Sequence, residues 1–291
     1  MNEFNTPEGK HMKIYIQRTL PLMLLLALLV SKQSFGQISI APTQVFIHEK
    51  QGAGEIFLTN TSEYPQEVSF EMKFGYPAST EEGAIFMMYD DSLNAKKSGL
   101  NNNIRLFPSR VVIPPNWSQT VRIQILSMRD KPEGVYWTRL LVSSSPVTPE
   151  VDGRATDGIS TNIDYVLEQN IPLFYRHGDP GTGVHVANVK STVDDSTGEL
   201  IVTPEIERTG SSPYLGTVYA TLYDSENRRI ENSEMPAYFY FRDWRRLKFG
   251  EIDASKGPFR LDLEFKTERR SIKSQDIVQA ETQEFSFQIL P

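Results

Sequence analysis

Histidine, cysteine and paired carboxylates build most catalytic and metal sites in proteins, and this chain offers few of them. It contains no cysteine, and after residue 36 its only histidines are His48, His177 and His185. His177 and His185 could in principle meet at one metal ion. No carboxylate or cysteine completes a ligand set with them, however, so a surface or hinge role is the simpler interpretation. The sequence therefore predicts no metal site.

Enzymatic motifs are also missing. The chain has neither a Gly-x-Ser-x-Gly nucleophile elbow nor a His-Glu-x-x-His zinc helix. The glycines of residues 178–183 lack the Gly-Lys-Ser/Thr ending of a phosphate loop, which favours a linker. The acidic pairs at 90–91 and 194–195 stand in turn-like contexts, where solvated carboxylates are usual, although a glycosidase pair stays open. We expect no catalytic residues, no cofactor and no enzymatic activity.

The most informative stretch is a row of apolar or β-branched side chains at alternate positions between residues 159 and 171. Its members are Ile159, Thr161, Ile163, Tyr165, Leu167 and Ile171. A period of two over this length predicts one long β-strand with one apolar face. Pro172 follows, and a strand that contains proline is usually an edge strand. Because a long apolar edge invites pairing with another chain, either the fold covers this row or the row recruits a partner.

The N-terminal segment predicts that the protein is exported from the cytoplasm. Lys13 and Arg18, the apolar run at 20–30 and the small residues at 34–36 predict a secretion signal in residues 1–36. The run is shorter than the ~20 residues that span a bilayer, although an uncleaved anchor stays open. The net charge of −7 argues against a nucleic-acid partner. Without cysteines, the domains must be held by core packing.

Short apolar alternations separated by turn residues, among them residues 134–142 and 259–265, fill the rest of the chain, which is typical of β-sandwiches. Residues 177–183 are rich in glycine and predict a hinge between a domain at 37–178 and a second one at 179–291. Residues 81–103 read as a polar loop in which 84–89 could form a strand. The role of that loop, and of the Trp-Arg-Arg at 244–246, stays open.

Five segments together resemble one family. They are residues 40–46, 55–62, 106–122, 133–139 and the Ile-Pro-Leu-Phe-Tyr-Arg of 171–176. In this order they are similar to the periplasmic pilus-assembly chaperones, the PapD-like superfamily. The similarity covers residues 38–178 well and the second domain only in class. It implies an all-β fold of two immunoglobulin-like β-sandwich domains joined by a short hinge, in a periplasmic protein.

The resemblance also implies a mechanism that the apolar row suggests independently. In the family, the strand before the hinge lends its apolar row to a subunit that lacks its last strand. Here the lending residues would be Ile163, Tyr165 and Leu167, extended by Ile159 and Thr161. The implied partners are pilus or surface-fibre subunits, and an outer-membrane usher is a further candidate.

Two charged residues match family positions that form an ion pair between the domains, Glu133 and Arg176, with Asp276 or Glu281 as a third member. One departure concerns the anchor for the client's terminal carboxylate. The family uses an Arg and a Lys where this chain has Gln44 and Pro172. Gln44 can still donate an amide hydrogen bond. Three alternatives stay open: another cation substitutes, the client presents no free terminus there, or strand donation has been lost.

Two other functions compete with the chaperone. The first is a PapD-like structural or adaptor protein of the cell envelope that donates no strand. The second is a secreted carbohydrate-active enzyme whose tryptophans, Trp117, Trp137 and Trp244, would stack on sugars, although tryptophan in such chains is usually a core residue.

Overall fold

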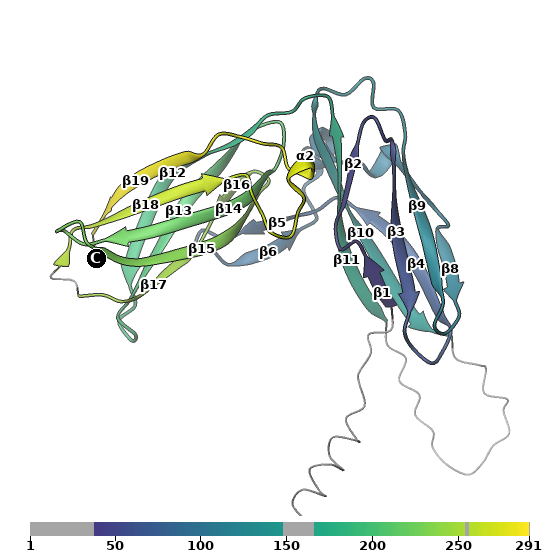
Figure 1. Ribbon diagram of the computed structural model, residues 1–291, viewed down its shortest axis with the longest axis horizontal. Helices are drawn as coiled ribbons and strands as arrows, with labels where there is room; N and C mark the ends of the chain where they lie inside the picture. Colours follow the sequence, from purple (N-terminus) through teal and green to yellow (C-terminus); the bar gives the residue numbers. More distant parts are fainter. Residues whose placement is uncertain (1–37, 148–165, 254–255, 291) are drawn as a thin grey trace, which may run out of the picture.

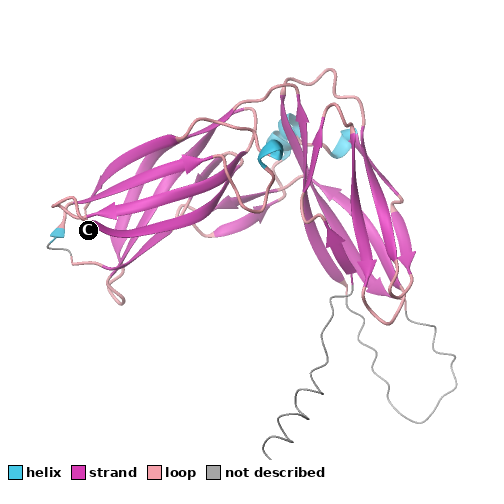
Figure 2. Cartoon of the chain, viewed as in Figure 1, coloured by secondary structure: helices cyan, strands magenta, loops and turns pink. Residues whose placement is uncertain are grey.

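The computed structural model describes residues 38–147, 166–253 and 256–290. Two β-sandwiches meet at an elbow, with the hinge on its outer side (Figure 1). Strands account for nearly all regular structure (Figure 2), which confirms the all-β prediction. The predicted signal lies outside the described residues. No helix in the described ranges has the length and apolar character needed to cross a membrane.

The first sandwich packs a four-stranded sheet against a five-stranded one. In order, the smaller sheet holds β1 (Ile38–Ala41), β3 (Ala53–Asn60), β9 (Ser118–Ile125) and β7 (Ile104–Phe107). The larger holds β2 (Val45–His48), β11 (Leu167–His177), β10 (Gly134–Pro146), β4 (Gln66–Lys73) and β8 (Arg110–Ile113). Alternate residues of each sheet face inward, and Ile56, Val121 and Leu140 are fully buried between them.

Asn60 ends β3 and ties together the turn that follows it. Its buried amide donates to the carbonyls of Tyr64 and Ile113 at 2.8 and 2.9 Å, and its oxygen accepts the Ser62 N–H at 2.9 Å. Replacing Asn60 with Ala leaves several of these buried backbone groups without hydrogen-bond partners. We expect a loss of about 1–3 kcal/mol in the free energy of unfolding, measured by urea titration. A loss below 0.5 kcal/mol, the range of ordinary surface changes, would contradict this role.

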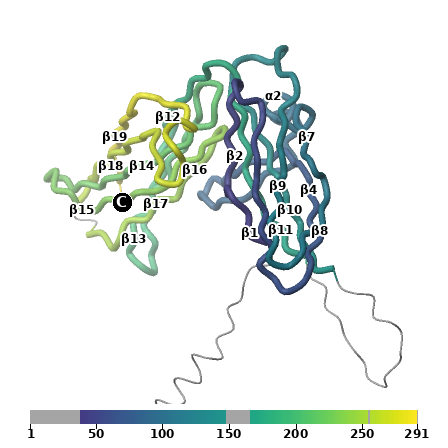
Figure 3. The backbone as a smooth tube through the Cα atoms, turned by 45° about the vertical axis from the view of Figure 1, so that its right-hand side comes forward, coloured from purple at the N-terminus to yellow at the C-terminus, as the bar shows by residue number. Residues whose placement is uncertain are grey.

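An insertion, which we call the arm (residues 74–100), leaves the first sandwich between β4 and β7. It contains the hairpin of β5 (Tyr76–Ser79) and β6 (Ile85–Met88), then α2 (Ser92–Ser98); the short 3₁₀ turn η1 (Asn101–Asn103) follows it. Asp91 caps α2 by accepting the Asn94 N–H at 2.9 Å. β6 falls within the strand that the sequence suggested at 84–89. Figures 1 and 3 show the hairpin projecting from the first sandwich toward the second.

The second sandwich also has two sheets. One contains β12 (Thr182–Val193), β13 (Glu199–Gly210), β16 (Arg242–Trp244) and β17 (Leu247–Glu251). The other contains β15 (Arg229–Phe239), β14 (Tyr214–Tyr223), β18 (Phe259–Lys266) and β19 (Gln283–Ile289); the 3₁₀ turn η3 (Ser274–Asp276) precedes β19. Strict alternation along β18 sends Phe259, Leu261, Leu263 and Phe265 into the core.

Candidate functional site

β11 is paired along its whole length on one side only. Its register with β10 runs from Leu167 opposite Ser144 to His177 opposite Gly134. On the other side β2 pairs with it in parallel, and only from Leu173 to Arg176. Among the described strands, none besides β10 pairs with the backbone of residues 167–172, although the Gln169 side-chain amide donates to the Ile38 carbonyl of β1 at 2.8 Å. This half of β11 presents a free backbone edge, as its sequence predicts.

The inward side of β11 carries the apolar row identified in the sequence. Ile171, Leu173 and Tyr175 are buried in the core of the first sandwich. Leu167 lies four residues before Ile171, on the same side of the strand, and is 39% exposed. The row therefore continues beyond the closed core. The other members predicted to bind a subunit, Ile159, Thr161, Ile163 and Tyr165, lie outside the described residues.

The opposite side of β11 contacts the arm. Asn170 donates from its side-chain amide to the Tyr89 hydroxyl at 2.6 Å, directly after the end of β6. The Lys73 ammonium lies 4.7 Å from the centre of the Tyr89 ring. Burial raises the pKa of Tyr89 above that of an ordinary phenol, which is itself protonated at neutral pH. The start of β11 is thus linked to the residue that follows the hairpin.

Gln44, the sequence candidate for holding a client carboxylate, is used inside the molecule. Its side-chain amide donates to the Ser271 carbonyl of the second sandwich at 2.9 Å. Gln44 therefore links the two domains in the described structure. Pro172 has no polar side chain with which to replace the family's cation.

Glu133 and Arg176 both lie at the hinge, where they meet through a third residue. Arg176 approaches the Asp179 carboxylate at 3.3 Å, and Glu133 accepts the backbone N–H of Asp179 at 3.2 Å. The described residues contain no direct ion pair between Glu133 and Arg176, because the Asp179 backbone and carboxylate stand between them. Asp276, the third member considered above, pairs with His48 of the first sandwich at 3.0 Å.

Sequence reasoning missed a third apolar cluster, which lies where the arm, the first sandwich and the second sandwich meet. Trp137 stands at its centre, 2% exposed, with ring centres of Phe74, Tyr240 and Phe241 at 5.5, 5.0 and 5.7 Å. A buried Trp137 has no access to a sugar, so it is a core residue and not a stacking platform. Trp117 is 66% exposed in the turn between β8 and β9 and is not part of this cluster.

No family model and no curated protein sequence matches the chain. Several solved structures are similar to it. The YadV chaperone is 11% identical, with 86% of this chain and 100% of that chain covered and a TM-score of 0.44. The class 5 fimbriae chaperone CfaA is 12% identical, with coverage of 87% and 99% and a TM-score of 0.40. The Salmonella enterica SafA pilin in complex with the SafB chaperone gives 11% identity, coverage of 89% and 99%, and a TM-score of 0.39.

Proposed function

We propose that this protein is a periplasmic chaperone that holds pilus or surface-fibre subunits by lending them the edge of β11. The observation that carries the proposal is the free edge of residues 167–172, from which the apolar row continues beyond the closed core. The five family segments, found in the sequence in the family's order, support the same function.

Strand addition explains how such an edge would bind. The free N–H and C=O groups pair with the client's backbone, and alternate side chains fill the groove left by the client's missing strand. Leu167 and the predicted Ile159, Thr161, Ile163 and Tyr165 form the inserted row. Each large apolar side chain contributes about 1.5–3 kcal/mol on burial, from which the ordering of strand and client subtracts.

Binding of the client's terminal carboxylate is not part of the proposal. Gln44 is bonded to Ser271, and neither Gln44 nor Pro172 carries charge. A charge-assisted hydrogen bond is about twice as strong as a neutral one, so these residues would make a weak anchor. The affinity is assigned to the strand itself.

A double substitution of the row, Ile163→Asp with Leu167→Asp, tests this function. The probe is an exported fibre subunit that lacks its last strand, co-expressed with the full chain. Two lost apolar contacts should weaken the 1:1 complex about 100-fold or more, measured by co-purification and calorimetry. Val112→Asp is the matched control, because Val112 is an exposed apolar residue on β8, at the opposite edge of the same sheet. Undiminished binding by the double variant would refute strand donation, and a homodimer joined through β11 would favour the adaptor function.

A further inference from the structure

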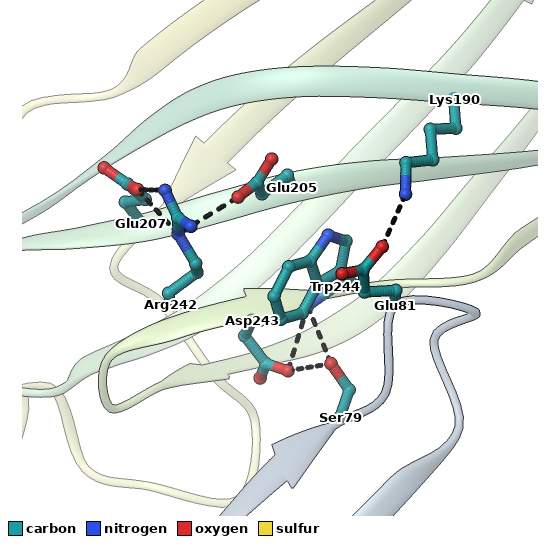
Figure 4. A network of polar contacts seen from close by, with 8 residues as sticks. All are labelled: Ser79, Glu81, Lys190, Glu205, Glu207, Arg242, Asp243 and Trp244. Carbon is teal, nitrogen blue, oxygen red and sulfur yellow. Dashed lines mark hydrogen bonds and ion pairs between the residues drawn. The ribbon is translucent and has the colours of Figure 1, made fainter.

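The two segments that the sequence left unexplained, the 81–103 region and residues 244–246, belong to regions that meet in the structure. The end of β5 lies against β16 of the second sandwich (Figure 4). Ser79 accepts the Trp244 N–H at 2.7 Å and donates its hydroxyl to the Asp243 carboxylate. At the turn that follows, Glu81 pairs with Lys190 of β12 at 2.8 Å. The hairpin tip therefore makes specific contacts with the other domain.

The fit at the tip is close. Gly83 has a backbone φ of +81°, and a Cβ added there would lie 2.6 Å from the Arg246 backbone nitrogen. Glycine is thus required twice, for the left-handed conformation and for the approach of two backbones. The close approach of the two backbones exists only because the hairpin tip packs against residue 246.

The receiving surface is held in place by its own charges. Asp243 and Arg245 are buried and lie 2.7 Å apart. Arg242 on the other side of the strand reaches Glu205 at 3.0 Å and Glu207 at 2.5 Å (Figure 4). Because β16 is fixed on both sides, the tip meets a firm support.

The base of the hairpin is fastened as well. Tyr76 lies with its ring centre 5.8 Å from that of Tyr240 and 4.9 Å from that of Phe241. Arg139 of β10 donates to the Gly75 carbonyl at 3.2 Å and to the Tyr240 hydroxyl at 3.3 Å. The hairpin is therefore held by the first sandwich at its base and by the second sandwich along its length.

Two domains joined by a short hinge move relative to each other unless a large apolar interface prevents it. Here the apolar cluster around Trp137, which includes Leu215 and Tyr240 of the second sandwich, already restricts such motion, and the arm adds to it. Outside the arm, the polar links between the domains include Gln44 to Ser271 and, beside the hinge, His48 to Asp276. The hairpin tip contacts the second sandwich at β12 and β16, away from those links. Contacts at a distance from a pivot resist rotation more than contacts beside it.

We propose that the arm is a strut that fixes the angle between the two sandwiches. It leaves the first sandwich, seats its tip against residues 243–246 and closes a second connection in parallel with the hinge. This inference does not depend on strand donation, and it would hold for an adaptor protein with the same fold.

A pair of glycine substitutions isolates the seating contact. Gly83→Ala introduces a Cβ at the Arg246 backbone, whereas Gly52→Ala introduces one with no heavy atom within 4 Å. Both glycines have positive φ, +81° and +61°, so both variants bear the cost of the left-handed conformation. Only Gly83→Ala also displaces the tip.

Because the chain has no cysteine, spin labels can be placed at Glu63→Cys and Asp195→Cys, two exposed turn positions in different sandwiches. The distance distribution between the labels, measured by double electron–electron resonance on the full chain, should be narrow in the parent and in Gly52→Ala. In Gly83→Ala it should broaden and shift. A distribution as narrow as the parent's in Gly83→Ala would overturn the proposal.

Ser79→Ala provides a second variant that leaves the backbone undisturbed. It removes the hydroxyl that links Asp243 to the Trp244 N–H without adding an atom. We expect a smaller broadening than with Gly83→Ala, in a protein that unfolds as cooperatively as the parent. If Gly83→Ala fails to fold, an unchanged distribution in Ser79→Ala decides against the strut.

Discussion

Arg245→Met should destabilise the second sandwich by about 3–5 kcal/mol, because it leaves the Asp243 carboxylate buried without its cation. The two side chains are 3% and 2% exposed and lie 2.7 Å apart. The Arg245 guanidinium also lies 4.7 Å from the Tyr238 ring centre, so its removal costs packing as well as charge. Urea titration followed by tryptophan fluorescence and circular dichroism measures the loss.

Lys248→Met is the control for this experiment. Lys248 pairs with Glu199 at 3.3 Å on the surface of the same sheet, and such pairs contribute about 0–1 kcal/mol. Similar losses in the free energy of unfolding of the two variants would show that the buried Asp243–Arg245 pair contributes no more to stability than a surface pair.

The loss in Arg245→Met should also depend on pH. Burial raises the pKa of Asp243 even beside Arg245, and removing the cation raises it further. The folded state then binds the proton more tightly than the unfolded chain, so its stability rises as pH falls. We expect the deficit of the variant relative to the parent to shrink between pH 7 and about pH 5. A deficit that grows over this range would contradict the assignment of the effect to Asp243.

Trp137→Ala is expected to cost about 3–5 kcal/mol, since it opens a cavity where the arm and both sandwiches pack together. Three aromatic rings have their centres within 6 Å of the Trp137 ring, and two of them, Tyr240 and Phe241, belong to the second domain. Thermal unfolding followed by calorimetry should show a lowered transition temperature.

Two companion variants separate packing from other causes. Trp137→Phe retains most of the apolar ring and removes a buried indole N–H for which the described part of the chain offers no hydrogen-bond partner. Its cost should stay below about 1.5 kcal/mol. Trp117→Ala, at an exposed site, should change stability by no more than about 0.5 kcal/mol. Equal effects of Trp137→Ala and Trp117→Ala would show that the interdomain cluster does not stabilise the fold.

Local pattern was sufficient for most of the strands. The alternation at 259–265 predicted β18, whose even-numbered residues are only partly buried and whose odd-numbered ones are fully buried. Where pattern failed, the missing information was tertiary. The sequence indicated alternation along 134–142, but every residue of that part of β10 is buried. The arm and the second domain cover the side that an isolated sandwich would expose to water.

Parts of the candidate site could also be predicted from the sequence, and other parts depend on tertiary contacts. The edge character of β11 follows from its period of two and from Pro172, and the register bears this out for residues 167–172. The seat of the arm could not be foreseen, because Ser79 and Asp243 lie 164 positions apart and neither stands in a motif. A polar loop with a short apolar stretch gives no sign of where it docks. The proposed lending of Ile163 and Tyr165 stays a prediction.

The double covering of β10 bears on how this protein can be divided for biochemistry. A fragment cut at the hinge would keep Val135 and Trp137 but lose Tyr240 and Leu215, which close over them. The hairpin of that fragment would have nothing to seat against, and its own exposed Ile85 and Phe86 would add to an apolar surface of the kind that promotes self-association. Separately expressed domains should therefore tend to self-associate. The two sandwiches should be produced together, in one chain that begins near residue 38.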